Sequence, residues 1–241
     1  MKKFGKILGG TLLVAILLAS VPGYFIVQEL LKARSGDPEV WESSIEALVE
    51  ETHSRGELHE PVLFTGSSSI RLWDTLKTDM QPFTIIQHGF GGAKLGDLEH
   101  YAERLVNDFA PRAVVVFAGS NDLQPDAVTN AEVLVATYRS FVDKVRRDLP
   151  TIPIYFIGIT PTPLRFSIWE EAKATNDAMK TYIAGQPNTH YIDVASRLLK
   201  PDGTPLRSNY RFDGLHPSAD GYAIWTDIVR TRLLRDLGAP R

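Results

Sequence analysis

Apolar and polar positions fall into alternating blocks along most of the chain. Short, continuously apolar runs rich in β-branched residues predict strands at 62–66, 83–89, 113–119, 152–158 and 190–195. The stretches between them carry apolar residues at helical spacing and predict helices at 70–80, 95–109, 129–148 and 168–184, with a closing helix from about Ser218. A further helix is predicted to begin at Pro38, after Asp37 as its N-cap, with Trp41 and Ile45 on one apolar stripe.

This order of elements defines a fold class. Strands that alternate with helices and are apolar at every position indicate a parallel sheet covered on both faces. Five strands predict an α/β fold, a three-layer α/β/α sandwich with a flavodoxin-like five-stranded parallel sheet. Because such sheets bind ligands outside the carboxyl ends of their strands, the residues that directly follow each strand are the first candidates for function.

The N-terminus has a different pattern. Ile7–Val27 is a run of 21 residues without a charge, and three lysines precede it. That length suits a membrane anchor, and a basic head before an apolar run is also typical of a cleaved signal peptide, so both remain open. Residues 1–34 are therefore predicted as an anchor or signal segment and 35–241 as one folded domain. The lysines favour a domain outside the cytoplasm, on the periplasmic side of the membrane, or secreted if the segment is cleaved.

Composition and charge exclude several classes of site. The net charge is −3 and the pI about 6.1, so there is no basic field for nucleic acid. The chain has no cysteine, which excludes disulfides, thiolate zinc sites and a cysteine nucleophile. The residues after the strands are small and polar, with neither a carboxylate cluster nor a phosphate-binding loop, so no metal and no cofactor is expected.

A serine and a histidine in these positions suggest nucleophilic catalysis. "FTGSSS" places three serines after the first strand, but a serine hydroxyl needs a base to become a nucleophile. His216 lies in the loop "FDGLHPSADGY", three residues after Asp213, a spacing that lets the carboxylate reach and orient the imidazole. His88 ends the second strand at the same edge of the sheet, where its side chain could equally be structural.

Groups that could stabilise an oxyanion follow the other strands. Gly92 can offer a backbone N–H with no side chain to block approach, and Asn121 can offer its amide. The N–H of Ser68 is a third donor. As alternatives, Gly92 could be a turn glycine and Asn121 could satisfy backbone groups of its own turn.

Four blocks in this order, "FTGSSS", "GFGGAKL", "VVVFAGSND" and "DGLHP", resemble the SGNH (GDSL) hydrolase superfamily, and the resemblance extends from about Trp41 to the closing helix. It implies a catalytic domain that performs esterase or lipase chemistry through an acyl-serine, without a metal. It also implies roles for five residues: Ser68 as nucleophile, Asp213 and His216 as the other triad members, and Gly92 and Asn121 with the Ser68 N–H as the oxyanion hole.

Two residues depart from the family pattern. Ser67 stands where the family has an aspartate, and Gln87 stands where many members have an asparagine. Neither change removes a catalytic group, but both leave the subfamily open. Ser67 and Ser69 are the alternative nucleophiles, and each could instead cap the following helix.

The substrate side is less defined. Trp73, Phe90, Arg165 and Trp169 are candidates to border the pocket, with core packing or solvent exposure as equal alternatives. The leading function is a serine esterase that removes a short acyl group, such as acetyl from a carbohydrate. A lysophospholipase or thioesterase acting on lipid acyl esters is the alternative if the domain is tethered to a bilayer. A catalytically inactive carbohydrate-binding domain is a third, although binding alone gives no reason to keep all three triad residues.

Overall fold

A computed structural model describes residues 29, 31–123 and 129–240, so the predicted anchor or signal run lies outside the described residues. Across those described ranges, none of the helices has the length and apolar character needed to cross a bilayer. The sheet order is β2-β1-β3-β4-β5, and every pair of neighbouring strands is parallel. The strands are β1 (Val62–Gly66), β2 (Ile85–Gly89), β3 (Ala113–Phe117), β4 (Ile154–Ile157) and β5 (Thr189–Ile192).

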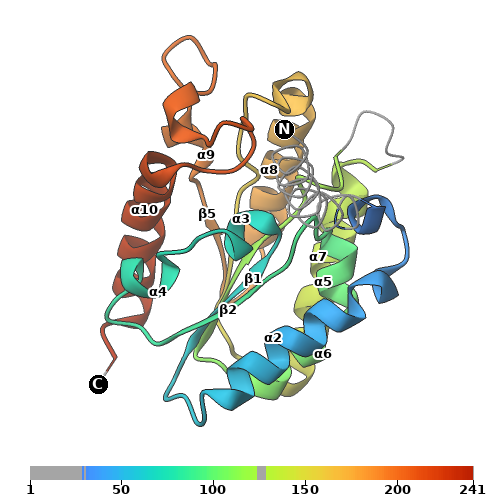
Figure 1. Cartoon of the computed structure of the whole chain (residues 1–241), viewed down its shortest axis with the longest axis vertical. Helices are drawn as coiled ribbons and strands as arrows, with labels where there is room; N and C mark the ends of the chain where they lie inside the picture. The colour runs from blue at the N-terminus through green and yellow to red at the C-terminus, as the bar shows by residue number, and fades with distance from the viewer. Residues whose placement is uncertain (1–28, 30, 124–128, 241) are drawn as a thin grey trace, which may run out of the picture.

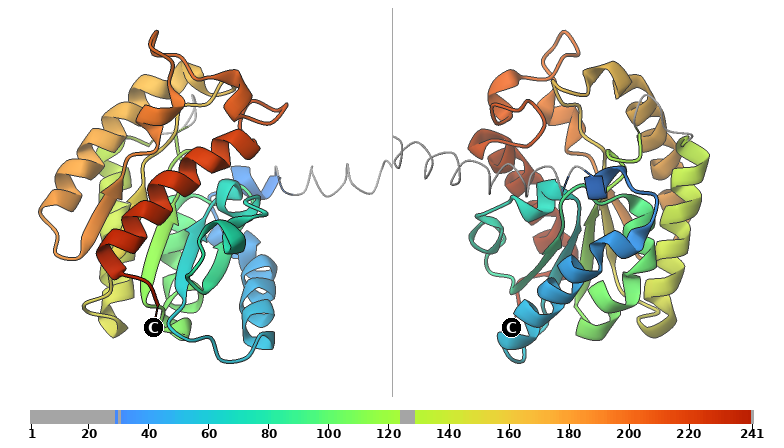
Figure 2. Two further views of the ribbon diagram at one scale, coloured as in Figure 1. Left: turned by 90° about the vertical axis from the view of Figure 1, so that its left-hand side faces the viewer. Right: turned by 45° about the vertical axis from the view of Figure 1, so that its right-hand side comes forward.

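Helices cover both faces of this sheet, which confirms the predicted three-layer sandwich (Figure 1). One face is covered by α2 (Glu42–Ser54), α5 (Leu95–His100), α6 (Ala102–Leu105), α7 (Ala131–Asp148) and α8 (Trp169–Ala184). The other is covered by α3 (Ser68–Arg71), α4 (Leu76–Asp79), α9 (Ala195–Leu198) and α10 (Ala219–Leu237). Figure 2 shows α10 crossing one face in its left view and α2 lying over the other in its right view.

The strands divide their side chains between two cores. In β1, Leu63 packs into the core under α2, α5 and α7, whereas Val62 and Phe64 pack into the core under α10. In β3, Val114 and Val116 pack into the core under α2, α5 and α7, and Val115 packs into the core under α10. Every residue of β1, β3 and β4 is buried, which explains why these strands are apolar without alternation.

The helix predicted at 70–80 is interrupted. The structure has α3 and α4 with a turn between them. The Gln87 side chain reaches across from β2, and its Nε2 donates to the carbonyl oxygens of Ile70 at 2.8 Å and Trp73 at 3.2 Å. These carbonyls would belong to the ladder of a continuous helix, so Gln87 stabilises the turn instead.

The helix predicted at 95–109 is also divided, into α5, α6 and a 3₁₀ turn at Asn107–Phe109. The bend falls at Tyr101, whose hydroxyl donates to the carbonyl oxygen of Pro38 at 3.2 Å. At the start of the domain, Asp37 caps a 3₁₀ turn at Pro38–Trp41 by accepting from the Glu39 N–H, as the sequence predicts. The apolar spacing predicts these segments but not the bends, because bends depend on side chains from other elements.

Two glycines allow neighbouring backbone segments to approach unusually closely at the carboxyl ends of β1 and β2. Gly66 and Gly89 are register partners. Gly66 has a φ of 149°, and a Cβ there would lie 2.1 Å from the Phe117 carbonyl oxygen. A Cβ on Gly89 would lie 2.3 Å from the Arg71 nitrogen, so α3 rests directly on the end of β2.

We expect Gly66→Ala to lower the free energy of unfolding by at least about 2 kcal/mol, because the new methyl group overlaps the backbone of β3. Gly96→Ala is the matched control, since no atom lies within 4 Å of the Cβ position of Gly96 in α5. That control should be neutral or stabilising by up to about 1 kcal/mol. Urea unfolding followed by circular dichroism measures both, and equal effects of the two substitutions would contradict the packing argument.

Candidate active site

Ser68 is the first residue of α3 and follows β1 after a single residue. Its neighbours Ser67 and Ser69 are buried, at 1% and 9% exposure, and the Ser67 side chain makes no capping hydrogen bond. Ser68 alone of the three serines lines the cavity that also contains His216. The middle hydroxyl is therefore the one presented to a ligand.

Ser68, His216 and Asp213 form one hydrogen-bonded chain. His216 Nε2 lies 2.8 Å from Ser68 Oγ, and His216 Nδ1 lies 2.7 Å from Asp213 Oδ2. Since an ionised carboxylate can only accept, Nδ1 carries the proton and Nε2 is left free to accept from the serine hydroxyl. Such an arrangement can remove the serine proton as a nucleophile forms.

The loop that carries the histidine is held by Asp213 itself. Asp213 Oδ1 accepts from the N–H groups of Leu215 at 2.8 Å and His216 at 3.0 Å. Partial burial acts to raise the pKa of Asp213, but the hydrogen bonds from the His216 ring and from these two amides outweigh it and hold the pKa below its ordinary value. Asp213 is therefore ionised at neutral pH and fixes the imidazole in place.

Gly92 and Asn121 line the same cavity as Ser68 and His216. Gly92 lies in the loop after β2 and has a left-handed φ of 72°. Asn121 follows β3, and its Nδ2 donates to the Ala93 carbonyl oxygen at 3.0 Å, which ties the two loops together. The predicted oxyanion groups thus share one wall of the cavity with the serine.

Two carboxylates hold the loop that contains Gly92. Asp97 Oδ2 accepts from the Lys94 N–H at 2.8 Å, and the Asp122 oxygens accept from the Leu95 N–H at 3.1 and 3.2 Å. Burial raises the pKa of Asp122 to about 7, and the nearby charge of Asp97 adds to the effect. Asp122 is a structural residue of this turn and fixes the start of α5 against the end of β3.

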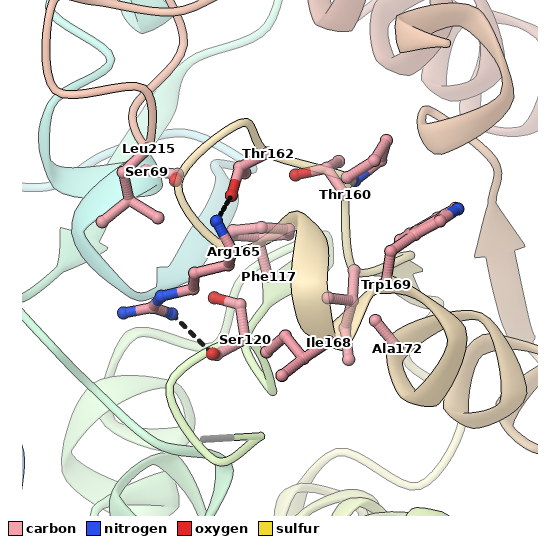
Figure 3. Close-up of a pocket in the computed structure, with 12 residues that line it drawn as sticks. Ser69, Phe117, Ser120, Thr160, Thr162, Arg165, Ile168, Trp169, Ala172 and Leu215 are labelled. Carbon is pink, nitrogen blue, oxygen red and sulfur yellow. Dashed lines mark hydrogen bonds between the residues drawn. The ribbon is translucent and has the colours of Figure 1, made fainter. Parts of the chain in front are cut away.

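Arg165 borders the cavity and contacts Ser120 (Figure 3) and Asn121. Its Nη1 donates to the Ser120 carbonyl oxygen at 2.5 Å and to Asn121 Oδ1 at 3.0 Å. Burial lowers the pKa of this guanidinium, and no carboxylate in the described part of the chain lies within ion-pair distance of it. Arg165 thereby fixes the orientation of the Asn121 amide, whose Oδ1 accepts from Arg165 and whose Nδ2 donates to Ala93.

The cavity has two parts. The main part is a cleft of about 590 Å³ that contains Ser68 and His216, and beside it lies a small hollow of about 20 Å³. Arg165 and Leu215 border both, and Trp169, which is 8% exposed, lines the hollow with Ile168 (Figure 3). The structure therefore brings two of the four substrate-side candidates, Arg165 and Trp169, to the site.

Trp73 and Phe90 do not line the cleft, and these two predictions are wrong. Trp73 is completely buried, stacked on Tyr222 of α10 with ring centroids 5.1 Å apart. Phe90 is 2% exposed and packs edge-on against Trp41. Trp73 lies shortly after α3, and Phe90 directly follows β2. Both positions are close to site residues in sequence, but packing against the two cores directs these side chains inward.

His88 lies below the site and does not contact it. It is completely buried, with Nδ1 2.8 Å from the Leu105 carbonyl oxygen and Nε2 2.9 Å from Thr52 Oγ1. Burial lowers the pKa of His88 to about 4, so it is a neutral structural residue. Within residues 29, 31–123 and 129–240, no group of three or more His, Asp or Glu side chains is placed to hold a metal ion.

One wall of the cleft is formed by residues that no sequence pattern marks as functional. Glu29 and Ala33, from the segment assigned to the anchor or signal, line it together with Arg71 of α3. Glu29 Oε2 lies 3.0 Å from Arg71 Nη2. No spacing or composition signal links residue 29 to residue 71, so this contact is visible only in three dimensions.

The chain is similar in sequence to known proteins over most of its length. The model of the GDSL-like Lipase/Acylhydrolase family matches residues 64–224, which include all three members of the Ser68, Asp213 and His216 chain. The platelet-activating factor acetylhydrolase IB subunit alpha1 of Rattus norvegicus is 26% identical over 189 residues, covering 72% of this chain and 75% of the relative.

Solved structures show the same fold at lower identity. A Streptococcus pneumoniae protein provisionally assigned as a platelet activating factor superimposes with a TM-score of 0.71 and 19% identity, covering 91% of this chain and 99% of that one. The acetylxylan esterase Axe2 of Geobacillus stearothermophilus superimposes with a TM-score of 0.60 and 19% identity, covering 75% of this chain and 95% of that one.

Proposed function

The chain belongs to the GDSL-like lipase/acylhydrolase family and is a hydrolase, and from this premise we propose that it is a serine esterase that removes a short acyl group through an acyl-Ser68 intermediate. The observation that carries the proposal is the hydrogen-bonded chain from Ser68 through His216 to Asp213. A domain that only bound carbohydrate would not need these hydrogen bonds between Ser68, His216 and Asp213.

Acylation begins when His216 Nε2 takes the proton of Ser68 Oγ and Oγ bonds to the ester carbonyl carbon. The carbonyl electron pair moves to the oxygen, and the resulting oxyanion accepts hydrogen bonds from the N–H groups of Ser68 and Gly92 and from Asn121 Nδ2. Collapse of this intermediate breaks the bond to the alcohol oxygen, which leaves with the proton from His216. Throughout, Asp213 stabilises the imidazolium at Nδ1.

Deacylation repeats these steps with water. His216 takes a proton from the water as its oxygen bonds to the acyl carbon, and the same donors hold the second oxyanion. Its collapse breaks the bond to Ser68 Oγ, which regains the proton from His216. The carboxylic acid is released, and the enzyme returns to its starting state without a cofactor in any step.

The size of the hollow favours a short acyl group. It is about 20 Å³, is bordered by Ser69 and Ile168, and shares Arg165 and Leu215 with the cleft, so it suits an acetyl methyl group and not a long chain. The open cleft of about 590 Å³ can take the alcohol part of the ester. The acetylhydrolase and acetylxylan esterase names of two relatives agree with this choice.

The proposal predicts hydrolysis of 4-nitrophenyl acetate and butyrate in preference to the octanoate and dodecanoate. Ser68→Ala should lower kcat by a factor of about 10⁴ or more, because it removes the nucleophile. Release of 4-nitrophenolate, followed by absorbance on the full chain, measures both effects.

Ser67→Ala is the matched control and should keep most of the activity. No hydrolysis above the Ser68→Ala background would refute the esterase proposal, whereas loss in Ser67→Ala alone would refute the assignment of the nucleophile. A maximum at octanoate or longer would favour a lysophospholipase or thioesterase acting on lipid acyl esters.

The contact between Arg165 and Asn121 makes Arg165 a positioning residue for the oxyanion hole. We expect Asn121→Ala to lower kcat about 10²- to 10³-fold. Arg165→Met should lower kcat about tenfold, which corresponds to about 1.4 kcal/mol, with KM little changed. In the Asn121→Ala background, Arg165→Met should have no further effect, because it acts through the missing amide.

Two further variants separate positioning from charge. Arg165→Lys should recover part of the lost kcat, since lysine can still donate to Asn121 Oδ1. Arg71 is a second cation in the same cleft, and its side chain donates to Glu29 and not to Asn121. Arg71→Met should therefore leave kcat nearly unchanged. Additive losses in the double variant, or a change confined to KM, would contradict the positioning role.

A further inference from the structure

Large apolar side chains are exposed around the mouth of the catalytic cleft. Of the five that stand out in the described part of the chain, three lie on segments that border the cleft: Leu31 at 56% exposure, Leu164 at 62% and Phe212 at 95%. A single exposed apolar residue is ordinary, but a group beside a binding site indicates an interaction surface. We refer to Leu31, Leu164 and Phe212 as the apolar rim.

Each residue of the rim lies within two positions of a residue that lines the cleft. Phe212 directly precedes Asp213, and Leu164 directly precedes Arg165. The Leu164 N–H donates to the Gly214 carbonyl oxygen at 2.9 Å, so these two segments lie side by side. Leu31 lies in the helical turn at 31–34, whose Ala33 lines the same cleft.

The sequence on the N-terminal side of the rim indicates what covers it. The described chain begins at Glu29 in the wall of the cleft, only two residues after the uncharged run Ile7–Val27 ends. Two residues of extended chain reach at most about 7 Å, so a run held in a bilayer would keep the cleft close to that bilayer. Lys32 and Arg34 lie shortly after Glu29. In a chain anchored through the uncharged run, this is where basic side chains meet lipid headgroups.

From this juxtaposition we propose that the active-site face docks on a lipid bilayer through the apolar rim, with Phe212 inserted at the headgroup level. The enzyme would then act on esters presented at that surface, with the ester entering the cleft from the membrane side. This inference deepens the proposed function and rests on it for the substrate class. The docking itself does not depend on turnover and can be measured separately.

The absence of cysteine from the chain allows a site-specific test. Phe212→Cys and Leu164→Cys are each made in the full chain and labelled with an environment-sensitive nitrobenzoxadiazole dye. Thr151→Cys is the matched control, because Thr151 is exposed at the amino end of β4, opposite the site. Each labelled protein is reconstituted into vesicles of phosphatidylcholine and phosphatidylglycerol.

We expect the dye at 212 and at 164 to brighten severalfold and shift to shorter wavelength in vesicles, and to be quenched by nitroxide-labelled lipid. The dye at 151 should show neither change. Signals at 212 and 164 equal to that at 151 would overturn the proposal. So would brightening that occurs without lipid and grows with protein concentration, because a second copy of the chain would then cover the rim. Hydrolysis of 4-nitrophenyl acetate by the unlabelled chain tests the esterase function separately.

Discussion

The geometry of the site depends on the close approach of backbones at the ends of β1 and β2. Gly66 and Gly89 are register partners, and neither position has room for a Cβ. Because the side chains are missing, α3 rests on the end of β2 and the chain turns sharply from β1. This turn carries Ser68 out over the carboxyl edge of the sheet, where the loops after β2 and β3 converge on it.

The partners of the serine come from distant parts of the sequence, and each is held by contacts of its own. His216 is 148 residues from Ser68, and its loop is fixed by hydrogen bonds to Asp213. Asn121 is fixed between Ala93 and Arg165. In the proposed mechanism the reacting groups are therefore arranged before a substrate arrives and need not reorganise as charge develops.

The sequence predicts the strands, the sandwich and the side chains that meet at its carboxyl edge, because buried parallel strands have a strong local signal and their ends share one edge. It predicts less where distant side chains decide the outcome. Gln87 interrupts the predicted helix at 70–80, Trp73 turns into the core against Tyr222, and Arg165 contacts Asn121. Each depends on residues far apart in sequence, which periodicity cannot reveal.

In the proposed reaction the Ser68 hydroxyl, activated by His216, attacks the ester. The most direct measurement is covalent trapping with an alkyl fluorophosphonate, followed by mass spectrometry of the modified peptide. We expect one adduct, on Ser68, and its loss in His216→Ala although the serine is still present. An adduct on Ser67 or Ser69, or equal labelling of Ser68 when His216 is replaced, would contradict it.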